Sequence, residues 1–113
     1  MREERKQKIN GIIKNDPFAR FLGAEVEIVK PGHSRVTLTV TSDMLNFHGM
    51  THGGVIFAVG DMAFAAASNS HEQTASGPIV LYDITIRDER SGEIVAKSQN
   101  LVYRKKEWFV PEE

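Results

Sequence analysis

The sequence predicts a single α+β domain over residues 1–113, in which a long apolar helix packs against antiparallel strands. Three observations support this prediction. The length is that of one domain. Two stretches in which apolar and polar residues alternate are each typical of a β-hairpin. Between them lies a stretch of almost wholly small and apolar residues with the length of a helix rather than of a strand.

The N-terminal segment, residues 2–22, is expected to be helical. Its first part, residues 2–14, carries isoleucines at helical spacing among charged residues, which indicates an amphipathic helix. Asp16 is a favourable N-cap and Pro17 suits the first helical position, so together they predict a second, short helix. Gly23 is expected to end this helix.

The two hairpins flank the long helix, which is expected over residues 53–69. In the first, residues 24–28 and 35–40 alternate in polarity on either side of the turn signal KPGHS, which predicts one buried and one solvent-facing side. In the second, IVLYDITIRD and EIVAKSQNLVYRK are joined by the turn DERSGE. The order of elements is therefore helix, hairpin, long helix, hairpin.

The composition argues against several classes of protein. The formal net charge of -1 gives no electrostatic reason to expect a nucleic-acid or membrane partner. The chain has no Cys, which excludes disulfides and thiolate zinc sites. Its charged start lacks the apolar core of a signal peptide, and the apolar stretch at residues 55–67 is too short to span a bilayer. We therefore expect a cytoplasmic protein, with no cofactor.

One charged residue, Asp61, lies in the middle of the predicted long helix. Burying a carboxylate without a partner is costly, and two interpretations remain open. Gly54, Asp61 and Ser68 are seven residues apart and would form a thin solvent-facing stripe. Alternatively, because residues 55–69 contain no Lys, Arg or Glu, Asp61 lies half-buried at a cleft as a functional carboxylate. We favour the second interpretation.

Two glycines, Gly53 and Gly54, open the same helix. The first N–H groups of a helix have no intrahelical partner, so an oxyanion or a phosphate can approach them where no side chain intervenes. The alternative is that the glycines only permit a tight turn into the helix. Gly53 and Asp61 are eight residues apart, about 12 Å along one helix axis, whereas a single carbonyl needs both groups within ~3 Å. A site that uses both therefore requires two subunits.

The histidines next to the glycines do not predict a metal site. His48 and His52 are four residues apart, but they precede the helix and are accompanied by no Glu or Cys. His52 is expected to orient the loop or to line a pocket.

The segment NFHGMTHGGVIFAVGDMAFAAASNS closely resembles the signature of the hotdog-fold acyl-CoA thioesterases of the phenylacetate-degradation (PaaI-like) type. That family shows Asn-x-x-Gly-x-x-His-Gly-Gly and then a helix with Asp eight residues after the first Gly of the pair. The segments on both sides are similar as well. The matching residues here are Asn46, Gly49, His52, Gly53, Gly54 and Asp61.

The resemblance implies a hotdog fold, an antiparallel sheet wrapped around a long central helix, assembled as homodimers or homotetramers. It implies hydrolysis of aryl-acyl-CoA (phenylacetyl or hydroxyphenylacetyl) or fatty acyl-CoA thioesters. Asp61 would be the general base or nucleophile, and the N–H of Gly53 would polarise the carbonyl oxygen. Asn46 would hold the reacting water or the thioester. His52 would support the loop and, with Gly54, contact the substrate.

The chain departs from the family pattern near Ser76 and Gly77, where a further strand carried by the family is missing. A second hypothesis is therefore a non-catalytic acyl-CoA-binding hotdog module. A hydratase on the same fold is less favoured, because no Asp/His pairing with Asp61 is visible. The basic residues at 104–106 would meet the phosphates of CoA or, in the interpretation we favour, simply solubilise a strand end.

Overall fold

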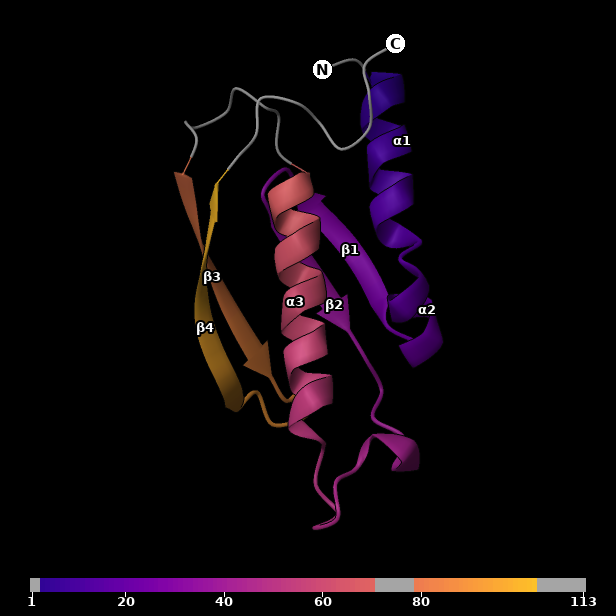
Figure 1. Ribbon diagram of the computed structural model, residues 1–113, viewed down its shortest axis with the longest axis vertical. Helices are drawn as coiled ribbons and strands as arrows, with labels where there is room; N and C mark the ends of the chain where they lie inside the picture. The colour runs from indigo at the N-terminus through magenta and orange to yellow at the C-terminus, as the bar shows by residue number, and fades with distance from the viewer. Residues whose placement is uncertain (1–2, 71–78, 104–113) are drawn as a thin grey trace.

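The computed structural model describes residues 3–70 and 79–103 and places a long helix at the centre of the molecule (Figure 1). One β-hairpin lies on one side of this helix, and the other hairpin lies behind it, flanked by the N-terminal helices. In chain order the elements are α1 (Glu3–Lys14), α2 (Pro17–Leu22), β1 (Glu25–Lys30), β2 (His33–Thr37), the 3-10 turn η1 (Ser42–Met44), α3 (Gly53–Asn69), β3 (Ile79–Arg87) and β4 (Ile94–Tyr103).

The N-terminal helices confirm the predicted signals. The Asp16 side chain caps α2, since its Oδ1 accepts hydrogen bonds from the N–H groups of Phe18 at 2.8 Å and Ala19 at 3.2 Å. Gly23 ends the helix in the left-handed conformation, with φ of 76°, which costs a glycine little. The long helix α3 covers the predicted residues 53–69.

The first hairpin differs from the prediction at both strand boundaries. Only Pro31 and Gly32 separate the two strands, so the turn is shorter than the predicted KPGHS. Strand β2 ends at Thr37 instead of continuing to Val40, because Thr37 pairs with Glu25, the first residue of β1, and the pairing partner ends there. The alternating pattern correctly predicted a strand here, but the length of β2 depends on β1, the strand with which it pairs.

The second hairpin agrees with the prediction, with β3 paired antiparallel to β4 around the expected turn. In the described residues each hairpin forms its own two-stranded sheet, so the expected single wrapped sheet is divided in two. Helix α3 packs against strands of both, which confirms the α+β class. The point of the expected missing strand, Ser76 and Gly77, lies outside the described residues, as do the basic residues 104–106.

One face of α3 forms the centre of the core. Met62 and Ala66 pack with Ala19 of α2 and Val26 of β1 in a buried cluster. Towards the other hairpin, the α3 backbone at Gly60 approaches β3 so closely that an added Cβ would lie 3.4 Å from Ile86 Cδ1. A Cβ at this distance would be in van der Waals contact, so a side chain longer than that of Ala would push the helix and β3 apart.

Two serines tie α3 to the first hairpin. The Ser34 hydroxyl of β2 donates a hydrogen bond of 2.6 Å to the carbonyl of Ala63. At the end of the helix the buried Ser70 Oγ donates to the carbonyl of Ala67 at 3.0 Å and accepts from the N–H of Gly32, also at 3.0 Å. These bonds fix the rotation of α3 about its own axis, and so decide which residues face outward.

Candidate functional site

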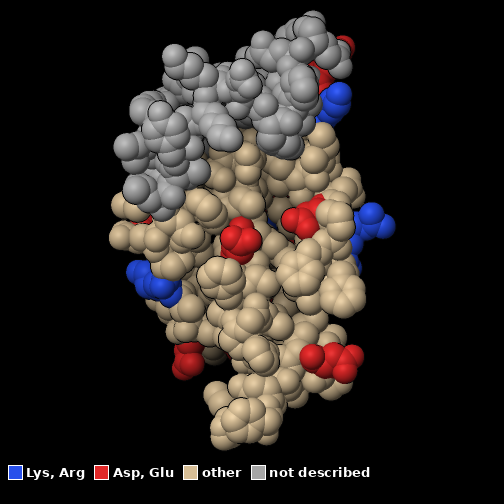
Figure 2. Space-filling view, in the orientation of Figure 1, with Lys and Arg blue, Asp and Glu red and all other residues tan. Residues whose placement is uncertain are grey.

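The outward side of α3 is a line of exposed residues at four-residue spacing: Gly53, Phe57, Asp61 and Ala65. We call these four residues the α3 stripe. Phe57 is 73% exposed, although the helix is otherwise apolar and carries no charge except Asp61. Figure 2 shows a largely uncharged face, with acidic side chains near its centre and the basic side chains at its margins. An apolar helix with one uncovered face is typical of a surface that another molecule covers.

Asp61 is exposed in the single chain, so the prediction of a half-buried carboxylate in a cleft is wrong for the chain by itself. The reason is that the two hairpins and α1 pack on the other sides of the helix. The alternative prediction, a solvent-facing line of Gly54, Asp61 and Ser68, is confirmed for the exposure of Gly54 and Asp61 but not for Ser68, which is only partly exposed. The stripe is nevertheless not polar, because Phe57 lies next to Asp61 along it.

The N-terminal end of α3 leaves one backbone donor free. His52 is the N-cap: its Nδ1 accepts the N–H of Gly54 at 2.9 Å. Its carbonyl oxygen accepts the N–H groups of Val55 at 3.0 Å and Ile56 at 3.3 Å. Among the described residues, no acceptor faces the N–H of Gly53. Of the first four amides of the helix, this one alone has no acceptor in the described part of the chain and can donate to a ligand.

The same cap distinguishes the two glycines. A Cβ on Gly54 would lie 3.1 Å from His52 Nδ1, so glycine at this position allows the imidazole to reach back to the helix. A Cβ on Gly53 would meet nothing within 4 Å, and its φ is not positive. The hypothesis that the glycines only shape the turn therefore fits Gly54, whereas nothing described in this chain requires glycine at 53.

Asn46 organises the loop that precedes the helix. Its Oδ1 accepts hydrogen bonds from the N–H groups of His48 at 2.9 Å and Met50 at 3.1 Å, and its own N–H donates to the Met50 carbonyl at 2.7 Å. Gly49 adopts the left-handed conformation that this tight loop requires. The side-chain oxygen is thus occupied, and only the Nδ2 group has no partner within the described residues.

This loop directs apolar side chains outward, a feature that the sequence analysis missed. Phe47 is 93% exposed and Met50 is 67% exposed. The available signal was the presence of two large apolar residues in a short segment that otherwise contains turn-forming residues.

The structure brings most of the predicted site residues together, but not all. Asn46, His52, Gly53 and Gly54 lie in one loop and helix start. Asp61 lies two turns further along the same straight helix, about 12 Å from Gly53 along the axis. The chain alone therefore does not bring the carboxylate to the free amide.

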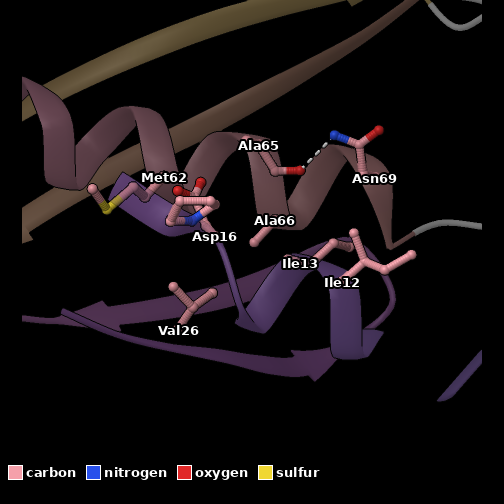
Figure 3. A pocket seen from close by; sticks show the side chains of 9 residues that line it. Ile12, Ile13, Asp16, Val26, Met62, Ala65, Ala66 and Asn69 are labelled. Atoms are coloured by element: carbon pink, nitrogen blue, oxygen red, sulfur yellow. Dashed lines mark hydrogen bonds between the residues drawn. The ribbon is translucent and has the colours of Figure 1, made fainter. Parts of the chain in front are cut away.

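An apolar groove opens beside the α3 stripe, between α3, β1 and the N-terminal helices (Figure 3). Its volume is about 460 Å³, and Ala65 belongs to both the groove and the stripe. Its two polar side chains already make hydrogen bonds, since Asp16 caps α2 and the Asn69 Nδ2 donates to the Ala65 carbonyl at 2.8 Å. The lining consists of Ile12, Ile13, Asp16, Pro17, Val26, Met62, Ala65, Ala66 and Asn69.

Neither a metal cluster nor a membrane span is found in the part of the chain that the structure describes. No three His, Asp or Glu side chains come together there in a group that would hold a metal ion. No helix in those residues has both the length and the apolar composition that crossing a bilayer requires.

No family model matches the chain, but its sequence and fold are similar to characterised proteins. The acyl-coenzyme A thioesterase PaaI of Escherichia coli is 42% identical over 64 residues, which are 57% of this chain and 46% of that protein. In these sequence alignments the chain spans somewhat less than half the length of the curated relatives that it matches.

Solved structures match over more of the chain. The structure of E. coli PaaI superposes with a TM-score of 0.76 and 25% identity, covering 90% of this chain and 94% of that one. The TT0310 protein of Thermus thermophilus superposes with a TM-score of 0.69 and 30% identity, covering 80% and 98%. A mutant of the phenylacetic acid degradation protein PaaI from the same organism superposes with a TM-score of 0.69 and 29% identity, covering 80% of this chain and 100% of that one. The chain therefore belongs to the PaaI-like family of hotdog-fold proteins.

Proposed function

We propose that this protein hydrolyses acyl-CoA thioesters to a free acid and CoA, at a site that two copies of the chain form together. The observation that carries the proposal is the free N–H of Gly53 on the same exposed stripe as Asp61, but two helical turns away. The E. coli relative named as an acyl-CoA thioesterase supports the reaction class.

The free amide of Gly53 is the electrophilic group of the proposed site. It points out of the positive end of the α3 dipole, and it donates to the thioester carbonyl oxygen. Negative charge develops on that oxygen when a nucleophile attacks, so the hydrogen bond strengthens towards the transition state. His52 keeps this donor in place, because its cap defines the first turn of the helix.

Asp61 of the partner subunit supplies the base or the nucleophile. As a base it takes a proton from water, the water oxygen attacks the carbonyl carbon, and the C–S bond breaks to release the CoA thiolate, which is then protonated. As a nucleophile its carboxylate oxygen attacks the carbonyl carbon, the C–S bond breaks to release the CoA thiolate, and water then hydrolyses the resulting acyl anhydride. The free Nδ2 group of Asn46, in the loop beside Gly53, donates to the water or to the thioester.

The acyl group lies in the apolar groove beside Ala65 in this proposal. Met62, the residue after Asp61, and Ala65, one helical turn from Asp61, both line the groove, and its polar side chains already make hydrogen bonds. Such a lining favours a fatty acyl or an unsubstituted aryl-acetyl group over a hydroxylated one, because a buried hydroxyl without a partner is costly.

A non-catalytic acyl-CoA-binding module is the second candidate. The division of the sheet into two hairpins within the described residues favours it, since the same surfaces would bind a thioester without the rigidity that catalysis demands. This candidate predicts tight binding of CoA esters without release of thiol.

The test is thiol release from acyl-CoAs by the Asp61→Asn variant. The chain contains no Cys, so a thiol reagent reports only the CoA that is released. We expect the turnover to fall by about 10²- to 10⁴-fold, because Asn cannot accept the proton, while binding of the CoA ester is retained. Asp83→Asn is the matched control: this carboxylate is exposed on β3, where it accepts a hydrogen bond of 2.9 Å from Gln99, and its loss leaves turnover unchanged.

Unchanged turnover in Asp61→Asn would refute the role of this residue. A wild-type protein that binds acyl-CoAs tightly but releases no thiol would favour the binding module instead.

A further inference from the structure

We propose that Asp16 is a specificity-determining residue, which makes the apolar groove select acyl groups with an uncharged end and reject the CoA esters of dicarboxylic acids. The proposal deepens the proposed function and rests on it in one respect, the position of the acyl group in the groove. It derives the class of acyl group from the charge that the groove carries.

One negative charge lies among otherwise uncharged groove residues. Of the nine side chains drawn in Figure 3, that of Asp16 is the only charged one, and none belongs to Lys or Arg. Seven of the others are apolar, and Asn69 is neutral. An acyl chain with a methyl or phenyl end therefore meets apolar surface. A chain that ends in a carboxylate meets a like charge there and no opposite one.

The charge of Asp16 is not neutralised within the described part of the chain. Both hydrogen bonds that its Oδ1 accepts, at 2.8 Å and 3.2 Å, come from uncharged backbone amides. Among the described residues, no Lys or Arg forms an ion pair with it. The N-terminal end of α2 offsets part of the charge. Because a helix end carries only about half an elementary charge, a net negative charge remains.

The same hydrogen bonds hold the carboxylate in place. Asp16 is half-buried, and Pro17, which follows it at the start of α2, restricts the backbone there. The Asp16 side chain cannot turn away from the groove without leaving two amides of α2 without their acceptor. An incoming carboxylate therefore meets a charge that stays where it is.

Two effects act against a carboxylate in this groove, and only one of them depends on Asp16. Any apolar lining disfavours a charged group, because the group loses its hydration. Asp16 adds Coulomb repulsion, which for charges ~5 Å apart at a partly exposed site lowers kcat/KM about 5- to 20-fold. This repulsion falls with distance, so it is largest for the dicarboxylic chain whose terminal carboxylate reaches Asp16.

The test compares thiol release from pairs of CoA esters of equal chain length: hexanoyl with adipyl, octanoyl with suberyl, and decanoyl with sebacyl. The measured quantity is the ratio of kcat/KM for the monocarboxylic ester to that for the dicarboxylic ester. Asp16→Asn removes the charge and keeps an N-cap residue of equal quality. We expect this variant to lower the ratio about 5- to 20-fold at one chain length and less at the others.

A second variant and a control separate the charge from other changes. Asp16→Ser also keeps an N-cap but brings no amide group that could donate to the substrate carboxylate, and it should lower the ratio as well. Asp43→Asn removes the same charge from an exposed position in η1 that does not line the groove, and it should leave the ratio unchanged. Thermal unfolding checks that each variant is folded.

The same ratio in the wild type and in both Asp16 variants would overturn the proposal. An equal fall in Asp43→Asn would overturn it too, because the net charge of the protein and not the groove would then select the substrate.

Binding distinguishes a failure of this proposal from a failure of the proposed function. In the Asp61→Asn background, calorimetry measures the Kd of octanoyl-CoA and of suberyl-CoA with and without Asp16→Asn. Preference for octanoyl-CoA that the added change reduces about 5- to 20-fold would support the role of Asp16 even if the wild type released no thiol. Thiol release by the wild type, together with a preference that the added change leaves intact, would keep the function and reject the role of Asp16.

Discussion

The two faces of α3 have the same kind of sequence but different surroundings. The inner face, with Gly60 and Met62, is buried against the core and both hairpins. The outer face, with Phe57 and Asp61, has no cover within the described chain. Because both faces, apart from Asp61, consist mainly of small and apolar residues, composition alone does not tell which of them the chain itself covers. The helix carries apolar surface on both faces, and the part of the chain that the structure describes covers only one of them.

The glycines of this helix show the same difference between the covered and the uncovered face of α3. At Gly60 the chain itself limits the side chain, because Ile86 lies at van der Waals distance from where a Cβ would be. At Gly54 the chain does so as well, through the His52 cap. Within the described residues, Gly53 has neither a neighbour close to where its Cβ would lie nor a positive φ, so we look for the reason for this glycine in the substrate or the second copy.

The largest of the remaining expected effects comes from placing a larger side chain on the inner face of α3. Gly60→Leu should lower the free energy of unfolding by about 1–3 kcal/mol, because its side chain would overlap Ile86 and force α3 away from β3. Denaturant unfolding measures this. The matched change on the outer face, Gly53→Ala, should leave stability almost unchanged and instead lower the turnover. If both variants lost equal stability, the contrast between the two faces would be wrong.

A smaller effect is expected at the start of the helix. His52→Ala removes the N-cap acceptor of the Gly54 amide and should cost about 1 kcal/mol of stability, measured by thermal or denaturant unfolding. His48→Ala is the control, since His48 lies in the same loop but caps no helix. Equal losses in both variants would show that the imidazole contributes through packing rather than through the cap.

The smallest effect concerns the groove beside the outer face. Ile12 lines it and is 47% exposed, so Ile12→Trp should narrow it without disturbing the core. We expect KM to rise several-fold for long-chain acyl-CoAs, which corresponds to a loss of binding free energy on the order of 1 kcal/mol. KM for short-chain acyl-CoAs should change little. Leu81→Trp, at an exposed position of β3, serves as control. A rise in KM that is the same for all chain lengths would place the acyl group elsewhere.

Most of the fold could be predicted because its signals are local. Asp16, Pro17 and Gly23 define α2 through the chemistry of helix ends, and α3 covers the residues that composition indicates. Local signals did not predict where β2 ends, because its end at Thr37 depends on where its pairing partner β1 begins. The groove was not predicted, because its lining comes from segments far apart in the sequence.

The sequence by itself determined the elements, the residues of the motif and the conflict between an apolar helix and its single carboxylate. These depend on spacing and on the chemistry of neighbouring residues. Only the tertiary structure decided that Asp61 faces outward, that the Asn46 oxygen is already bonded and that, of the first-turn amides of α3, only that of Gly53 has no acceptor among the described residues. Exposure and hydrogen-bond partners depend on which elements pack around a residue, and the rotation of α3 is set by contacts with strands distant in the chain.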